Sequence, residues 1–381
     1  MPCPARRRAA TDRRAVLAGL AVFLAAAACE VSQVPVEPVK PGKVVMGYYR
    51  TSSRTVYGHA EIDFAYLTHI AHAFAWPDSS GNLFVPDGFL YPELNAAARA
   101  AGVKMIVSLG GWGNCAGFPG AASTAANRSR LAAQLVDFCL ANGYDGADLD
   151  WEFVSNDQEK ADFSLLVETL AAAFKARSPQ LLLTIAAPAG NYHGRWIDFE
   201  RLAASFDLIG FMTYDYHGSW SGHAGHNAPL YAPPGDACGS LDESFAYALS
   251  RGVPLGKLLV GLPFFGRSFD CGAMGAAFTT CRNWSYAEIQ GLPWSDWTRV
   301  WDDAAQAPFL RRNDGGLIIS YDDMSSAGLK AQYVKDKAGA GVIIWELGDD
   351  YRSGSAELLE VVGRSFGARS AISRRPGRSS P

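Results

Sequence analysis

Four acidic residues stand close together in the segment DGADLDWEF, residues 145–153. Asp148, Asp150 and Glu152 alternate there with apolar residues. Because a period of two is typical of a β-strand, we expect the three carboxyls on one face of a strand. Repulsion from Asp150 should raise the pKa of Glu152, the residue nearest the strand's end, so that it acts as a general acid. The two deeper carboxyls can share a proton.

Eight short apolar runs recur along the chain with helix-like stretches between them. Strands that alternate with helices indicate a parallel sheet, and eight of them predict a closed (β/α)8 TIM barrel. An open doubly wound sheet is the alternative, but it should carry a Gly-rich phosphate loop after its first strand, and GYYRTSSRT is not one. The runs lie around residues 45–50, 69–76, 104–111, 145–153, 181–188, 206–215, 257–266 and 341–347.

Polar and aromatic residues stand where the expected strands end, and the active site of such a barrel collects at the carboxyl ends of its strands. Aromatic rings can stack on the apolar faces of sugars, while Asp, Arg and Tyr hydrogen-bond sugar hydroxyls. Together with a proton donor they predict a glycosidase. The residues at the strand ends include Tyr48, Phe74, Gly111, Trp112, Tyr214, Asp215, Arg267 and Trp345.

A gap of about 75 residues before the eighth run is far longer than an ordinary connection. Its middle part, residues 268–320, is interpreted as a small α+β insertion. Cys271 and Cys281 close a short loop there and are the best candidates for a disulfide in an exported protein. The insertion also holds three tryptophans whose helix-like spacing predicts packing, namely Trp294, Trp297 and Trp301.

Residues 1–28 have the pattern of an export signal. Arginines precede an apolar run, Ala15–Ala28, that is too short to span a membrane. Cys29 follows a small-residue cleavage site, which raises the possibility of a bacterial lipoprotein attached to a membrane through a lipidated Cys29. Residues 11–17, TDRRAVL, resemble a twin-arginine signal, and an ordinary secretory peptide is the alternative. We expect a secreted or cell-surface bacterial protein.

Three further segments follow the signal. Residues 29–42 contain prolines and no amphipathic period, which indicates an extended tether. Residues 43–366 form the expected catalytic barrel, and residues 367–381 form a basic tail that predicts disorder. The formal net charge of −4 argues against nucleic acid as a partner. We expect a monomer.

His217, His223 and His226 raise the question of a metal. Their segment, HGSWSGHAGH, is Gly-rich and lacks a regular ligand spacing, and the cysteines show no zinc signature. The carboxyls of residues 148–152 could instead hold Mg²⁺, which would make the protein a metal-dependent barrel hydrolase. We expect neither metal nor cofactor.

Several short motifs occur in a fixed order. Residues 145–152 read DxxDxDxE, residues 108–111 read SxGG, and residues 212–215 read MxYD. Trp345 ends the eighth expected strand. With these motifs the chain resembles glycoside hydrolase family 18, the chitinases and their relatives, over residues 43–366. The insertion is similar to the α+β module of the subgroup with deeper clefts.

The resemblance implies a retaining, substrate-assisted mechanism without metal or cofactor. Glu152 would protonate the glycosidic oxygen while the acetamido carbonyl of the sugar attacks the anomeric carbon, forming an oxazolinium ion. Asp150 would hold the acetamide N–H and Tyr214 would donate to the acetamido oxygen, with Asp148 below them in the catalytic set. The implied substrate-binding residues are Tyr48, Phe74, Gly111, Trp112, Met212, Asp215, Arg267 and Trp345. The implied structural residues are Ser108, Gly110 and Asp145.

The implied substrate is chitin or chitooligosaccharides, and two relatives of this activity stay open. One is an endo-β-N-acetylglucosaminidase that acts on glycans or peptidoglycan. The other is a catalytically weak chitin-binding lectin, although such lectins usually lose the acid and Glu152 is present here.

Overall fold

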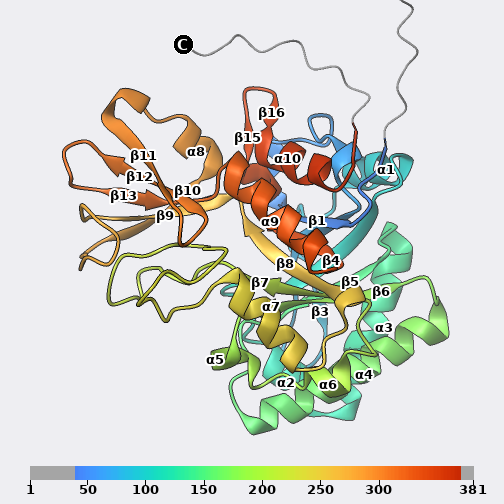
Figure 1. The fold of residues 1–381 in the computed structure, drawn as a ribbon. Helices are drawn as coiled ribbons and strands as arrows, with labels where there is room; N and C mark the ends of the chain where they lie inside the picture. The colour runs from blue at the N-terminus through green and yellow to red at the C-terminus, as the bar shows by residue number, and fades with distance from the viewer. Residues whose placement is uncertain (1–38, 370–381) are drawn as a thin grey trace, which may run out of the picture. The chain divides into compact units, whose positions relative to one another are not determined.

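Eight parallel strands close into a barrel in the part of the chain that the computed structural model describes, residues 39–369 (Figure 1). Neighbouring strands pair around the ring, and the pairing of the first strand with the second closes it. This confirms the predicted (β/α)8 barrel, with one strand in each predicted run. The barrel strands are β1 (Val44–Arg50), β2 (His69–Pro77), β4 (Lys104–Gly110), β5 (Gly146–Asp150), β6 (Leu182–Pro188), β7 (Leu208–Met212), β8 (Leu258–Pro263) and β14 (Gly341–Trp345).

Residues 1–38 and 370–381 lie outside the described part, and so do the predicted signal peptide, Cys29 and most of the tether and tail. Where the described part begins and ends, Val39 and Arg369 form an antiparallel bridge with two N···O distances of 2.9 Å. Within this part, no helix is both long and apolar enough to cross a membrane.

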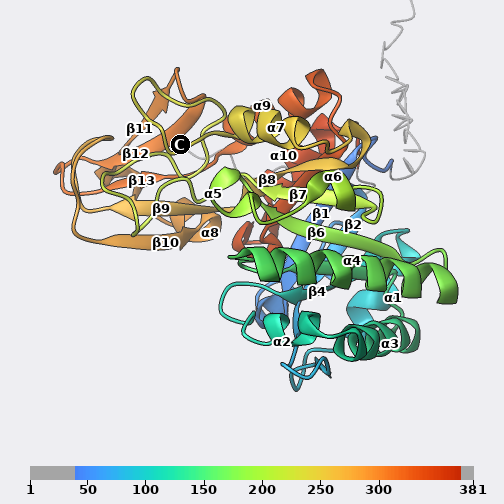
Figure 2. The same ribbon diagram turned by 90° about the horizontal axis from the view of Figure 1, so that it is seen from below.

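Helices lie on the outside of the barrel, and the sequence marks where they begin and end (Figure 2). The hydroxyl of Thr124 accepts a hydrogen bond from the Asn127 amide at 3.1 Å, and Gly143 ends the same helix at φ 72°. The Asn156 side chain caps the next helix through the Glu159 amide at 2.9 Å. These helices are α1 (Pro92–Ala100), α2 (Phe118–Ser123), α3 (Ala125–Asn142), α4 (Asp157–Arg177), α5 (Asn191–Gly194), α6 (Phe199–Leu202), α7 (Leu241–Ser250), α9 (Met324–Asp336) and α10 (Glu357–Ser365).

The segment between β8 and β14 forms a second sheet, as predicted for an α+β insertion (Figure 1). Its five strands are antiparallel in the order β10-β9-β13-β12-β11, and one short helix, α8 (Tyr286–Gln290), follows β10. Among the two-residue strands, β3 (Leu83–Phe84) pairs antiparallel with the end of β2, and β15 (Tyr351–Arg352) pairs with β16 (Ser355–Ala356). The insertion strands are β9 (Phe265–Phe269), β10 (Cys281–Ser285), β11 (Trp297–Asp302), β12 (Ala307–Arg312) and β13 (Ile318–Ser320).

The predicted disulfide between Cys271 and Cys281 is wrong in this structure, where both thiols are free. The register of β9 and β10 explains the difference, because Phe269 is the residue opposite Cys281. Cys271 lies two positions beyond that pair, and its thiol donates to the Ala273 carbonyl at 3.4 Å.

The spacing of the insertion tryptophans resembles that of a helix, but these residues do not lie in an α-helix. Trp294 lies in a single 3-10 turn, and Trp297 begins β11, which contains Trp301 as well. Trp297 and Trp301 are four residues apart, so they share one face of a strand rather than of a helix.

The barrel interior is packed with side chains and forms its own apolar cluster. Met46, Tyr48, Leu259 and Ile343 are buried in it, and other barrel residues complete it. Because side chains fill it, this interior is a packed core and not a pore. Full burial of one aliphatic side chain stabilises the folded state by about 1.5–3 kcal/mol. Any carboxyl on the inner face of a strand therefore lies next to apolar side chains and is poorly hydrated.

Candidate active site

Asp148 is the deepest of the three carboxyls of the 145–153 segment and is fully buried. Its Oδ2 accepts hydrogen bonds from the hydroxyls of Tyr48 and Ser108, both at 2.8 Å, and its Oδ1 accepts one from Thr184 at 2.6 Å. Burial raises the pKa of Asp148, and the three hydroxyl donors oppose that rise. Asp148 is thus held by three hydroxyl groups and lies below the other two carboxyls.

Asp150 lies one step higher on β5 and is 3% exposed. Its Oδ1 is buried and has no hydrogen-bond partner within residues 39–369. Burial raises the pKa of Asp150 well above its usual value, and the charges of Glu152 and Asp148 add to this. A buried carboxyl oxygen without a partner is costly, and it marks a place where a ligand N–H would fit.

Glu152 follows the end of β5 and is half-buried. Its pKa is raised to about 7, first by burial and then by the charge of Asp215, while the Trp112 amide lowers it. The rise that the sequence predicted is present, and burial and the charge of Asp215 contribute to it in addition to the predicted repulsion. The repulsion between Asp150 and Glu152 is also present, because the charge of Glu152 raises the pKa of Asp150. A carboxyl with this pKa is suited to donate a proton near neutral pH.

Aromatic residues from three strands surround the carboxyl end of the barrel. The Trp345 ring, at the end of β14, lies 5.6 Å from the ring of Phe74 and 5.6 Å from that of Tyr48, between centroids. Trp112 is 80% exposed on the rim. An exposed indole and a partly buried one give two apolar faces of the kind that bind sugar rings.

The glycine pair before Trp112 permits a close approach between strands. Gly110 and Gly111 adopt φ of 107° and 76°, a region that favours glycine. A Cβ on Gly110 would lie 2.2 Å from the Asp150 carbonyl oxygen, and one on Gly111 would lie 2.4 Å from the Phe74 ring. At the opposite end of the barrel, Asp145 Oδ2 accepts the Met105 amide at 2.8 Å, which fits its predicted structural role.

The segment after β7 brings Tyr214 and Asp215 to the same end of the barrel. Asp215 has a positive φ of 61°, and its Oδ1 lies 2.7 Å from a terminal guanidinium nitrogen of Arg267. Met212 ends β7 at the edge of the barrel-interior cluster. Burial and then the charge of Asp150 raise the pKa of Tyr214 well above its usual value, so its hydroxyl remains a hydrogen-bond donor.

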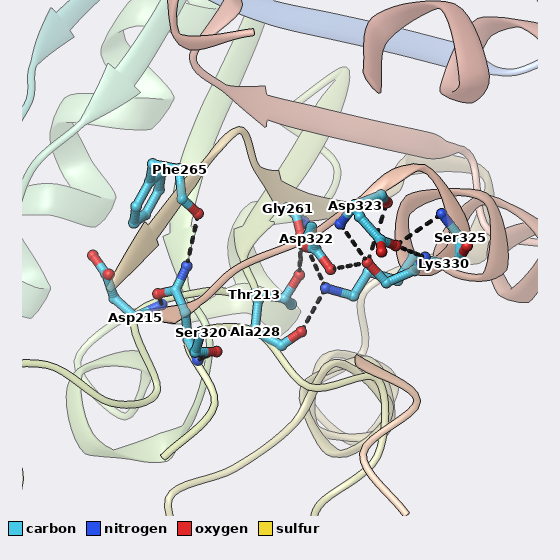
Figure 3. A network of polar contacts seen from close by, with 12 residues as sticks. Thr213, Asp215, Ala228, Gly261, Phe265, Ser320, Asp322, Asp323, Ser325 and Lys330 are labelled. Carbon is cyan, nitrogen blue, oxygen red and sulfur yellow. Dashed lines mark hydrogen bonds and ion pairs between the residues drawn. The ribbon is translucent and has the colours of Figure 1, made fainter. Parts of the chain in front are cut away.

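A polar network behind this segment holds it in place (Figure 3). The side-chain oxygen of Asn227 accepts the Asp215 amide at 3.2 Å, and its nitrogen donates to the Phe265 carbonyl at 3.3 Å. Beside it, the fully buried Lys330 of α9 pairs with Asp322 at 2.5 Å. Its ammonium also donates to the Ala228 carbonyl at 2.5 Å.

Sequence reasoning did not find Asn227, Lys330 or Cys115. The Cys115 thiol donates to the Asp150 carbonyl at 3.3 Å and accepts the Glu152 amide at 3.1 Å, so it spans the turn between the two carboxyls. An open pocket of about 310 Å³ lies beside Glu152 and is lined in part by Cys115. These residues lie in no motif, and only their contacts across the fold reveal them.

Gly261 of β8 leaves room for Tyr214, and replacing it should disturb the site. A Cβ there would lie 2.7 Å from a Tyr214 ring carbon and 2.8 Å from the Thr213 amide nitrogen. We expect Gly261→Ala to lower the free energy of unfolding by about 1–3 kcal/mol, as overpacking does. Urea unfolding would measure this change. Gly256→Ala is the matched control, because a Cβ at Gly256 meets nothing within 4 Å, and an equal loss there would contradict the explanation.

Comparison with known protein families gives one match over most of the chain. The model of the glycosyl hydrolases family 18 matches residues 44–350. Chitinase A1 of Niallia circulans is 32% identical over 80% of this chain and 56% of its own length, so the chain spans just over half of that relative. Endochitinase 1 of Metarhizium robertsii is 33% identical over 77% of this chain and 72% of its own length.

Solved structures agree with this fold. A family 18 chitinase from Cycas revoluta, solved with (GlcNAc)3, has a TM-score of 0.78 at 26% identity and covers 85% of this chain and 100% of that one. A family 18 N-acetylglucosaminidase from Paenibacillus barengoltzii has a TM-score of 0.76 at 29% identity, with coverage of 85% and 99%.

Proposed function

Because the chain belongs to the glycosyl hydrolases family 18, we propose that it is a chitinase that hydrolyses β-1,4-linked N-acetylglucosamine. One observation supports this above the others. Glu152, with a pKa of about 7, stands above the buried Asp150, whose Oδ1 has no partner among the described residues. A proton donor next to an unpartnered carboxyl oxygen is what a sugar bearing an N-acetyl group requires. The chitinases among the relatives agree with this choice.

The proposed reaction uses the substrate's own acetamide. Glu152 gives its proton to the glycosidic oxygen as the bond from that oxygen to the anomeric carbon breaks. The acetamido carbonyl oxygen forms a new bond to the anomeric carbon from the opposite face, which makes an oxazolinium ion. Asp150 Oδ1 accepts the acetamide N–H and its charge stabilises the cation, while Tyr214 donates to the acetamido oxygen. Water then attacks the anomeric carbon from the face that the leaving group left, the bond from the acetamido oxygen to that carbon breaks, and Glu152 takes a proton from the water, so the configuration is retained.

Digestion of chitohexaose tests this proposal. We expect shorter chitooligosaccharides whose new reducing ends are first formed as β-anomers, seen by NMR within the first minutes. A thiazoline analogue of the oxazolinium should inhibit the reaction. Products that first appear as α-anomers, or insensitivity to the thiazoline, would contradict the mechanism.

The N-acetylglucosaminidase among the similar structures favours a second candidate. Such an enzyme would release single N-acetylglucosamine units or act on other glycans. The same digestion separates the two functions, because stepwise release of monomer alone would favour the second candidate. A lectin would leave chitohexaose intact.

The pKa of Glu152 predicts how activity depends on pH. Because a general acid must be protonated, kcat/KM should fall as pH rises through about 7. Asp215→Asn removes a charge that raises this pKa, so its alkaline limb should move to lower pH. The exposed Asp157 offers a control, Asp157→Asn, whose profile should match the parent. Unchanged limbs in both variants would argue against Glu152 as the titrating acid.

We also propose that the protein is exported and attached to a membrane through Cys29. This rests on the sequence of residues 1–28 and Cys29 alone. Cys29→Ala should move the protein from the membrane fraction to the soluble fraction of the cell envelope or the medium. Equal membrane content in variant and parent would contradict the lipid anchor.

A further inference from the structure

Four metal-binding side chains meet on the long connection between β7 and α7. They come from two stretches of that connection, His217 with His223 and Asp236 with Cys238. Each offers one ligand atom, and these atoms all lie within 4.8 Å of one another. Two imidazoles, a carboxylate and a thiol form a donor set that suits Zn²⁺.

The distances in this cluster agree with a tetrahedral site. His217 Nε2 lies 3.3 Å from His223 Nε2 and 3.4 Å from Asp236 Oδ2. When Zn–N and Zn–O bonds measure about 2.0–2.1 Å, two ligands of a tetrahedron lie about 3.3–3.4 Å apart. Two of the six ligand pairs therefore already have tetrahedral separations, and a bound zinc ion would draw together any longer pair, all of which lie within 4.8 Å.

The hydrogen bond on the other side of His217 fixes which nitrogen can coordinate. His217 Nδ1 lies 3.0 Å from the His226 carbonyl oxygen, which can only accept, so Nδ1 carries the hydrogen. In the neutral ring, Nε2 then presents a lone pair to the carboxylate of Asp236. Two acceptors in contact repel each other, and a cation between them removes the repulsion. A backbone carbonyl behind a coordinating histidine is the usual support in zinc sites.

The surroundings hold His217 rigidly and leave the other side of the cluster open. His217 is fully buried, and a Cβ on Gly225 would lie only 2.3 Å from its Nε2, so only glycine leaves room for the ring. Cys238 is exposed, which gives an ion a path from solvent. The third histidine of the sequence pattern does not take part, because His226 Nε2 lies 3.0 Å from Asp302 Oδ2.

We propose that His217, His223, Asp236 and Cys238 bind one Zn²⁺ ion, which joins the two stretches of the β7–α7 connection. Four protein ligands leave no position for substrate or water, so the site is structural and takes no part in hydrolysis. Tyr214 and Asp215 lie near the start of this connection, shortly after β7. A metal that links its two stretches would keep this rim of the active site ordered, since it removes conformations from the unfolded connection.

Metal analysis and cobalt substitution test the site on the full chain, without substrate. After incubation with Zn²⁺ and gel filtration, plasma mass spectrometry should find one zinc per chain. With Co²⁺ in place of Zn²⁺, a thiolate-to-cobalt charge-transfer band should appear in the near ultraviolet, together with the strong visible bands of tetrahedral cobalt. Removal of the metal by a chelator should lower the Tm by several degrees.

Two thiol variants decide which cysteine is the ligand. Cys238→Ser should lose the charge-transfer band and weaken Zn²⁺ binding by more than about 100-fold, because even changes behind a ligand cost 10- to 100-fold. Cys271→Ser, which removes another partly exposed free thiol, should keep both. Fewer than one zinc per chain in the parent protein would overturn the proposal. So would a charge-transfer band that survives in Cys238→Ser. Neither result depends on whether the protein hydrolyses chitin.

Discussion

The variant Glu152→Gln is expected to lose about 10³–10⁴-fold in kcat on chitohexaose while binding it as tightly as the parent protein. Glutamine has the shape of a protonated glutamate and can occupy the same place, but it has no acidic proton to give to the leaving oxygen. The Glu152 amide would still donate to Cys115. Chromatography of the products measures kcat, and calorimetric titration at a concentration where turnover is negligible measures binding.

A second carboxyl beside the same pocket supplies the control. Glu159 lines the pocket next to Glu152, and its carboxylate accepts the Ser155 amide at 2.9 Å. Glu159→Gln should retain nearly all activity, because its carboxylate binds Ser155 in front of α4 and has no part in the proposed reaction. Equal turnover in Glu152→Gln and the parent would reject Glu152 as the acid. A substrate whose leaving group needs no proton should restore much of the lost bond cleavage in Glu152→Gln.

Asp150→Asn should cost about 10²–10³-fold in kcat, a loss like that on removal of one hydrogen-bond donor that stabilises a transition state. Asparagine has almost the same volume, but it carries no negative charge to stabilise the oxazolinium. The loss should persist with a leaving group that needs no proton, which separates this variant from Glu152→Gln. The cationic form of the thiazoline analogue should also bind more weakly to Asp150→Asn.

Stability measurements distinguish this loss from simple damage to the fold. Asp150 is buried with one unpartnered oxygen, so its charge is costly to the folded state. Asp150→Asn should therefore melt at the same temperature as the parent or higher. A lower Tm accompanied by the loss of activity would show that Asp150 supports the fold rather than the reaction.

The barrel could be predicted because its strands repeat one local pattern. Each run is short, apolar and followed by a helix-like stretch, and the same alternation placed Asp148 and Asp150 on one strand face. Contacts between distant segments could not be predicted in this way. Asn227 bonds to Asp215 and to Phe265, and the second of these lies 38 residues away in the sequence.

Spacing in the sequence gave wrong predictions where the pairing of strands decides which residues meet. Cys271 and Cys281 are close in sequence, yet the pairing of β9 with β10 puts Phe269 opposite Cys281. The pKa of Glu152 shows the same limit. Its nearest charged neighbours in sequence suggested repulsion from Asp150, but they could not suggest the contribution of Asp215, which reaches Glu152 only through space. The histidine segment alone could not predict the proposed zinc site, because its other two ligands, Asp236 and Cys238, lie further along the chain.

The ion pair of Lys330 and Asp322 has a consequence for how the enzyme fails on heating. Both side chains are buried, and Lys330 also holds the Ala228 carbonyl of the connection behind the active site. Opening that connection alone would leave the Lys330 ammonium paired with Asp322 but without its Ala228 acceptor, and a hydrogen bond to a charged group contributes about 1.5–3 kcal/mol. Thermal inactivation should thus coincide with cooperative melting of the whole barrel, without an earlier stage in which a folded protein has already lost its activity.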